Sequence, residues 1–145
     1  MKKVIIIIVS IVVVILGAIL IMSWLGNSKP KSDIKAAENV IYINHNASTI
    51  TKTNVYYGED LYYISNYKKD DKKYICVLDR DFNLTMNVEE NSLKEIEEIK
   101  NEEYVVGYKY DKLIYEIKKE NKDGFTYSYY DTLTGEFIKK INIDR

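Results

Sequence analysis

Residues 79–90, DRDFNLTMNVEE, come closest to a pattern of known chemistry in this sequence. Oxygen-bearing side chains stand at positions 1, 3, 5, 9 and 12 of a twelve-residue calcium-loop pattern, namely Asp79, Asp81, Asn83, Asn87 and Glu90. At position 6 that pattern needs a glycine for its sharp turn, but Leu84 stands there, and a strand rather than a helix leads in. We therefore interpret the segment as a polar turn and predict no metal site, with calcium binding as the alternative.

The chain contains one histidine, His45, and one cysteine, Cys76. A single histidine provides no pair of imidazole ligands for zinc, and a single cysteine allows neither an intramolecular disulfide nor a thiolate cluster. We expect His45 at a helix end, where a cation interacts favourably with the last carbonyls. Cys76 is expected to be a small buried residue of a strand. The sequence thus predicts no catalytic residue, no cofactor and a protein that is not an enzyme.

Charge is well mixed along most of the chain. Leaving Lys2 and Lys3 out of the 21 basic residues, 19 remain against 22 acidic ones, for a net charge of −3. A nucleic-acid partner is excluded because it would need a basic patch for its polyanionic backbone. No glycine-rich phosphate loop is present, so no small-molecule substrate is evident.

Residues 4–24 form an apolar run interrupted only by Ser10, Gly17 and Ser23. At about 1.5 Å per residue, a helix of this length spans roughly 30 Å, the thickness of a bilayer's hydrocarbon core. We therefore expect a transmembrane helix at residues 4–24, after a short cytoplasmic tail at residues 1–3. The alternative is a cleaved signal peptide, but that has a shorter apolar region and a small-x-small cleavage site.

A basic start followed at once by an apolar run is typical of a signal-anchor, which exports the part that follows it. This predicts a single-pass protein of the cell membrane with the N-terminus cytoplasmic and the C-terminal domain outside. Residues 25–32, LGNSKPKS, are typical of a polar linker, which reaches at most about 26 Å. We therefore expect the partner to be another membrane-anchored protein.

The rest of the chain predicts two similar halves. After Asp33, an N-cap residue type, apolar residues recur at helical spacing to about residue 46. The motif SLKE at residues 92–95 matches a capping box and predicts a second short helix. Alternating or aromatic-rich segments predict strands at residues 49–57, 61–67, 74–78, 104–110, 113–119, 125–130 and 136–143.

The two halves align at a constant offset of 52 residues, for example Tyr56 with Tyr108 and Asp79 with Asp131. The sequence therefore predicts an α+β fold with an N-terminal transmembrane helix. Two tandem modules follow, at residues 33–90 and 91–145, each a helix packed on an antiparallel sheet.

The 14 tyrosines suggest a binding surface. Phe125, Tyr127 and Tyr129 share one face of an expected strand. Exposed on the open side of a sheet, such residues would bind a partner protein. The alternative is that they complete the core, so the partner-binding residues stay unknown.

Three motifs in the second half resemble a PepSY-type hairpin. They are LIYEI at residues 113–117, FTYSYYDTLTGE at residues 125–136 and IKKI at residues 138–141, which give an aromatic strand, a D-x-x-T-G-E turn and a returning strand. Together with the basic start, the apolar run and YGEDLYY at residues 57–63, they make the whole chain similar to the YpmB/TseB-like family of low-GC Gram-positive bacteria.

The resemblance implies two cystatin-like modules, TseB-like at residues 33–90 and PepSY-like at residues 91–145. It also implies a non-enzymatic, membrane-anchored extracytoplasmic binding module that regulates cell-wall elongation through contact with a penicillin-binding protein. PepSY-type segments resemble protease-inhibitory propeptides as well. The alternative function is therefore an inhibitor or modulator of an exported peptidase.

Overall fold

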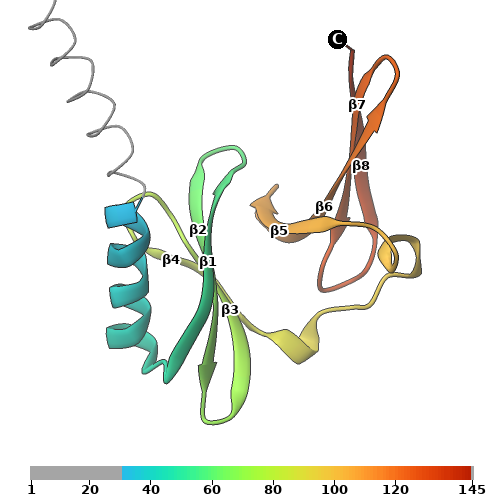
Figure 1. The fold of residues 1–145 in the computed structure, drawn as a ribbon. Helices are drawn as coiled ribbons and strands as arrows, with labels where there is room; N and C mark the ends of the chain where they lie inside the picture. Colours follow the sequence, from blue (N-terminus) through green and yellow to red (C-terminus); the bar gives the residue numbers. More distant parts are fainter. Residues whose placement is uncertain (1–30, 145) are drawn as a thin grey trace, which may run out of the picture. The chain divides into compact units, whose positions relative to one another are not determined.

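The computed structural model describes residues 31–144, which form one helix and two four-stranded antiparallel sheets (Figure 1). The helix covers residues 31–45. The first sheet contains β1 (Thr49–Tyr57), β2 (Leu61–Lys69), β3 (Lys72–Leu78) and β4 (Leu84–Glu89). Two 3-10 turns follow, η1 (Glu90–Ser92) and η2 (Glu97–Ile99). The second sheet contains β5 (Tyr104–Lys109), β6 (Lys112–Asn121), β7 (Gly124–Asp131) and β8 (Phe137–Asp144). Both sheets belong to one compact unit, which begins at Ala36.

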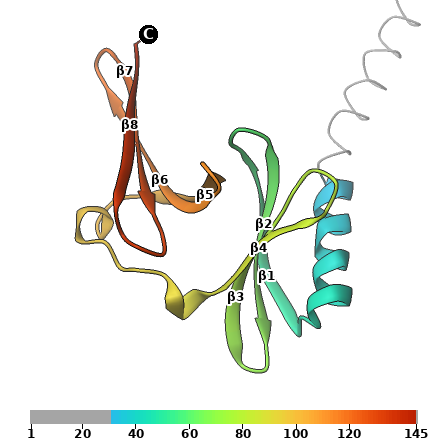
Figure 2. The ribbon, with the colours of Figure 1, turned by 180° about the vertical axis from the view of Figure 1, so that it is seen from behind.

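The helix buries an apolar stripe against the first sheet. Ala37 and Ile41 are fully buried, because residues four apart lie on one helix face. The ring of His45 contacts Tyr67 of β2 at 5.9 Å between centroids. Figures 1 and 2 show residues 36–45 beside β1 to β4 from both sides.

Strands β2 and β3 are buried on both faces. Ser65 and Cys76 pair on the face of Tyr67, which contacts the helix. Ile64 and Val77 pair on the opposite face, and both are buried. Double burial accounts for the nearly unbroken apolar run of β3, since neither face meets water.

The second sheet repeats the first along the sequence. Shifted by 52 residues, β2 would cover residues 113–121, and β6 spans Lys112–Asn121. Shifted in the same way, β3 would cover residues 124–130, and β7 spans Gly124–Asp131. The strand positions thus agree with the internal repeat of the sequence.

The helix predicted from residue 92 is absent, and the predicted fold class is wrong. Leu93 has extended backbone, with φ −72° and ψ 141°, and the linking segment forms only η1 and η2. The sequence also did not predict β4, which pairs with β3 and leaves residues 90–103 between the sheets. Tertiary contacts hold this segment: the backbone N–H of Lys94 donates to the carbonyl oxygen of Thr132 at 2.8 Å. The described residues are therefore mostly β, with one helix and two sheets, rather than two tandem helix-on-sheet cystatin-like modules.

The predicted transmembrane helix at residues 4–24, the tail at residues 1–3 and linker residues 25–30 lie outside the described residues. Within residues 31–144, no helix combines the length and the apolar composition that crossing a membrane requires. The predicted membrane-spanning element and the single-pass membrane localisation are therefore corrected, and we do not retain them.

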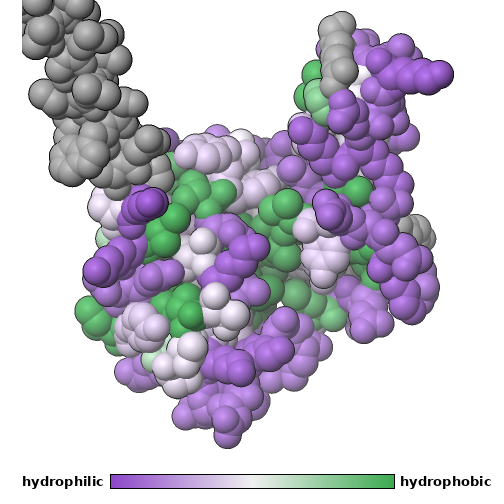
Figure 3. All heavy atoms as spheres, viewed as in Figure 1, coloured by the Kyte–Doolittle hydropathy of each residue, from purple (hydrophilic) through white to green (hydrophobic). Residues whose placement is uncertain are grey.

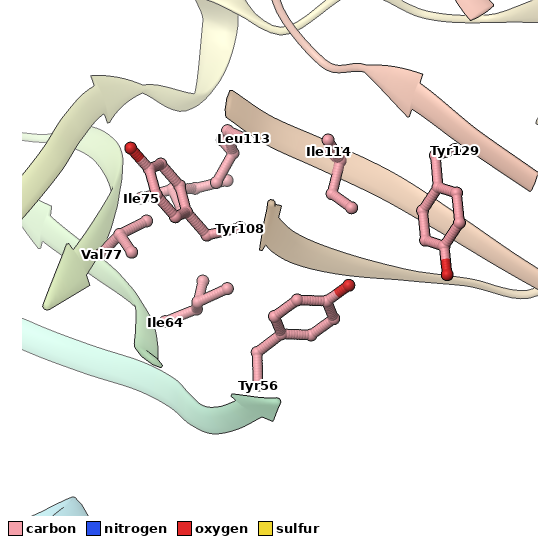
Figure 4. Packing of buried hydrophobic residues seen from close by; sticks show 8 residues of the cluster. All are labelled: Tyr56, Ile64, Ile75, Val77, Tyr108, Leu113, Ile114 and Tyr129. Carbon is pink, nitrogen blue, oxygen red and sulfur yellow. The ribbon is translucent and has the colours of Figure 1, made fainter. Parts of the chain in front are cut away.

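The main hydrophobic core joins the two sheets (Figure 4). Its buried members come from β1, β2 and β3 on one side and from β5, β6 and β7 on the other: Tyr56, Ile64, Ile75, Val77, Tyr108, Leu113, Ile114 and Tyr129. A smaller cluster holds the linking segment against β6, where Ile96 and Ile99 pack with Tyr115 and Ile117. Figure 3 shows apolar patches set among hydrophilic residues on one face of the molecule.

Candidate binding groove

A groove of about 940 Å³ lies between the first sheet, the linking segment and β5. Its apolar lining includes Val55, Ile64, Ile75, Leu93, Ile96 and Val106. Its charged lining includes Lys52, Lys94, Glu95, Glu97 and Lys100. A groove of this size that offers both apolar and polar lining groups is a candidate ligand or peptide site.

Two open strand edges border this groove. β1 pairs only with β2, and β5 pairs only with β6. The outer edge of each strand therefore carries backbone groups without a strand partner. Val55 of β1 and residues 104–106 of β5 line the groove, and Val105 is 50% exposed. Such an edge is the kind of surface to which an extended segment can add as a further strand.

The charges of the groove are only partly neutralised within the chain. Glu97 is 3.3 Å from Lys100, and Glu90 is 3.7 Å from Lys73 outside the groove. Lys52, Lys94 and Glu95 form no ion pair with another described residue. Within residues 31–144, the groove lining holds three lysines and three glutamates, and because Glu90 is paired outside the groove, two unpaired lysines and one unpaired glutamate remain for a bound partner.

Tyr56 fastens β1 to the second sheet next to the groove. Its hydroxyl donates a hydrogen bond of 2.6 Å to Oε2 of Glu116 in β6. The ring lies over Gly107 of β5, where a Cβ would stand 2.4 Å from Cζ of Tyr56. Burial, followed by the hydrogen bond to Glu116, raises the pKa of Tyr56 well above its usual value. The hydroxyl therefore remains a donor at neutral pH, and the contact is a structural anchor.

The segment predicted as a polar turn begins as one, at Asp79. Its Oδ1 accepts hydrogen bonds from the backbone N–H groups of Asp81 and Asn83, at 2.9 and 2.8 Å. Burial alone would raise the pKa of Asp79, but the hydrogen bonds from Asn83 and Asp81 outweigh burial and lower it. Asp131 makes the equivalent turn in the second sheet, where its Oδ1 accepts from the N–H groups of residues 133 and 134.

The remaining oxygen ligands of the calcium-loop pattern lie farther along the chain. Asn87 lies within the extended strand β4, where it hydrogen-bonds to the hydroxyl of Tyr67, and Glu90 begins η1. An EF-hand loop instead wraps its ligands around one point. Among residues 31–144, no three histidine, cysteine, aspartate or glutamate side chains are grouped to hold a metal ion.

His45 and Cys76 lie in the elements predicted for them. Burial and, after it, the charge of Lys69 lower the pKa of His45, so the environment favours the neutral ring rather than the predicted cation. Cys76 is fully buried, and burial raises the pKa of its thiol to about 12. A thiol in this state is not a nucleophile at neutral pH.

The aromatic face of β7 contributes to the core. Tyr129 is a member of the main cluster, and Tyr127 packs against it. Lys118 places its Nζ 4.2 Å from the ring centroid of Phe125 and 5.8 Å from that of Tyr127. For Tyr127 and Tyr129 the structure supports completion of the core, whereas Phe125 is half-buried beside Lys118.

Sequence reasoning missed the groove because its lining comes from three separate parts of the chain. The available signal was VVG at residues 105–107 of an expected strand. A glycine inside a strand often marks the close approach of another segment. Here that segment is Tyr56.

No known family model matches this chain, and no curated protein matches it in sequence. A comparison with solved structures finds the YpmB protein from Bacillus subtilis, with a TM-score of 0.65 and 16% sequence identity. The match covers 75% of this chain and 96% of that chain. The chain has a YpmB-like fold.

At this identity the likeness to YpmB shows the fold alone, because one fold supports many functions. It supports the YpmB part of the resemblance noted in the sequence. It does not show separate TseB-like and PepSY-like domains.

Proposed function

We propose that this chain is a non-enzymatic protein-binding module whose groove receives a segment of another protein. The observation that carries the proposal is the groove itself, a depression of about 940 Å³ with a mixed apolar and charged lining, bordered by the open edges of β1 and β5. Burying apolar side chains there would provide the main favourable term for binding. The unpaired lysines at its border would add selectivity for the partner.

We further propose that the partner is a penicillin-binding protein and that the role is regulation of cell-wall elongation. This part follows from the resemblance of the sequence motifs to the YpmB/TseB-like family. The YpmB-like fold supports it at the level of architecture. Inhibition of a peptidase remains the alternative prediction.

The test captures labelled penicillin-binding proteins directly. The full chain is immobilised and incubated with a detergent extract of a low-GC Gram-positive bacterium in which fluorescent penicillin marks every penicillin-binding protein. We expect at least one labelled band to be retained above a bare-matrix control. If the dissociation constant of the complex between this chain and the penicillin-binding protein is near 10 μM, its binding free energy is about −7 kcal/mol. Retention of no labelled protein would refute the proposed partner.

Two matched variants connect this capture to the groove. Val105, which lines the groove, and Phe137 of β8, which does not, are 50% and 57% exposed. Val105→Lys should therefore reduce the retained fluorescence at least about tenfold, which corresponds to about 1.4 kcal/mol. Phe137→Lys should leave it unchanged. Equal retention by both variants would show that the partner binds elsewhere.

A further inference from the structure

We infer that the groove takes its partner as an added β-strand, paired with the open edge of β5 at Tyr104 and Val106. This inference rests on the proposed binding function and names the backbone groups that would hydrogen-bond to the partner. The occupant is an extended segment of a partner protein, with apolar side chains at alternate positions and an acidic residue.

The direction of the backbone groups of β5 follows from its hairpin. β5 and β6 are joined by a two-residue turn at residues 110–111, both with φ of 55°, which is typical of a type I′ turn. Such a turn joins a hydrogen-bonded pair, here Lys109 and Lys112. Hydrogen-bonded and non-hydrogen-bonded pairs alternate along an antiparallel ladder. The backbone groups that point to the open edge therefore belong to Tyr104, Val106 and Tyr108.

One end of this edge is closed by the turn between β1 and β2. A Cβ at Gly58 would lie 2.6 Å from the carbonyl oxygen of Tyr108, so the turn lies directly against that residue. Tyr104 and Val106 remain on the open part of the edge, and both line the groove. In the described part of the chain, no backbone hydrogen bond from outside the sheet reaches either residue.

The lining of the groove defines the side chains of the occupant. Successive side chains of an added strand would point alternately toward and away from the first sheet, with about 3.3 Å between residues. The inward set would meet Val55 and Leu93, which line the groove and are half-buried. Lys52, Lys94 and Glu95 are without ion-pair partners among the described residues, and the two lysines outnumber the glutamate, so an acidic residue is favoured. About five residues, roughly 17 Å of extended chain, suffice to pair across Tyr104 and Val106.

The probe is a displayed library of random linear twelve-residue peptides, selected on the full chain without any assumed partner. We expect the selected peptides to share apolar residues at every second position and at least one acid. Val106→Pro removes the outward N–H of β5 and should weaken these peptides at least about tenfold, measured by fluorescence anisotropy.

A matched control lies on the other open edge of the second sheet. Lys140 of β8 pairs with Ser128 of β7. Counted from the two-residue turn at residues 122–123, the backbone groups of Ser128 point toward β6. The N–H of Lys140 therefore points away from β7, to the open edge. Lys140→Pro therefore removes the same kind of donor away from the groove and should leave peptide binding unchanged. An equal loss in both proline variants would overturn the assignment to β5.

Amide hydrogen exchange on the wild-type chain provides a measurement that does not depend on a proline variant folding. A saturating peptide should slow exchange at Tyr104 and Val106 at least about tenfold. Unchanged exchange, undiminished binding to a folded Val106→Pro variant, or a library without binders would each overturn strand addition. If peptides add to β5 but no penicillin-binding protein is captured, the proposed partner fails and the strand-addition mode stands.

Discussion

Replacing Gly107 by alanine should destabilise the protein by displacing Tyr56. A Cβ at position 107 would lie 2.4 Å from Cζ and 2.5 Å from Cε2 of the Tyr56 ring. Non-bonded carbon atoms stay about 3.5 Å apart, so the ring must move by about 1 Å. A shift of that size takes the 2.6 Å hydrogen bond between Tyr56 and Glu116 beyond ordinary hydrogen-bond length.

The size of the effect follows from two terms. Overpacking a well-filled site costs about 1–3 kcal/mol, and losing a hydrogen bond to a charged acceptor costs about 1.5–3 kcal/mol. Gly107→Ala should therefore lower the free energy of unfolding by about 2.5–6 kcal/mol. At roughly 4 °C per kcal/mol for a domain of this size, Tm falls by at least roughly 10 °C. Urea and thermal unfolding followed by circular dichroism measure both quantities.

A double-mutant cycle separates this mechanism from a general intolerance of β5 to alanine. Leucine at position 56 lacks Cε, Cζ and the hydroxyl, so Gly107→Ala made in a Tyr56→Leu background should cost less than about 1 kcal/mol. The coupling between the two positions should exceed about 1.5 kcal/mol, well above the scatter of independent sites. The same cost of Gly107→Ala in both backgrounds would refute the reasoning.

Three further predictions concern titratable groups. Because the pKa of Tyr56 is raised in the folded state, its contribution to stability is present below about pH 10 and is lost as pH rises. Tyr56→Phe should therefore lose less stability than the wild type between about pH 10 and 12. Urea unfolding measures this, and an equal dependence of the unfolding free energy on pH in both proteins would contradict it. Hydrogen bonds from Lys112 and from two backbone N–H groups outweigh the burial that would raise the pKa of Asp131 and leave it lowered, so its stabilisation is present above about pH 4 and is lost as pH falls. Asp131→Ala should cost about 1.5–3 kcal/mol at pH 7 and Asp131→Asn less, with both gaps to the wild type narrowing below pH 4; a gap independent of pH would exclude the carboxylate. Cys76, fully buried with a thiol pKa raised to about 12, should resist a thiol reagent at pH 8 until urea unfolds the chain, and rapid reaction of the folded protein would show that the strand opens.

The turns and most strands were predictable because their signals are local. Alternating apolar residues and short charged turns predicted seven of the eight strands, and the turn at Asp79 was expected from its polar residues. β4 was missed because its residues, LTMNVE, are half polar and half exposed. The capping-box motif at residues 92–95 predicted a helix that tertiary contacts override, because the backbone N–H of Lys94 bonds to Thr132 and Ile96 and Ile99 pack against β6.

By itself, the sequence determined where the strands and their turns lie, through alternation, turn chemistry and a 52-residue repeat that each act within a few neighbouring residues. Only the tertiary structure decided how the two sheets pack together and which of their residues line the groove. The contact of Tyr56 with Gly107 and Glu116 joins residues about 50 to 60 positions apart, and the groove collects side chains from β1, the linking segment and β5. Local pattern carries no information about such pairings, because they depend on which faces remain unburied after each sheet has formed.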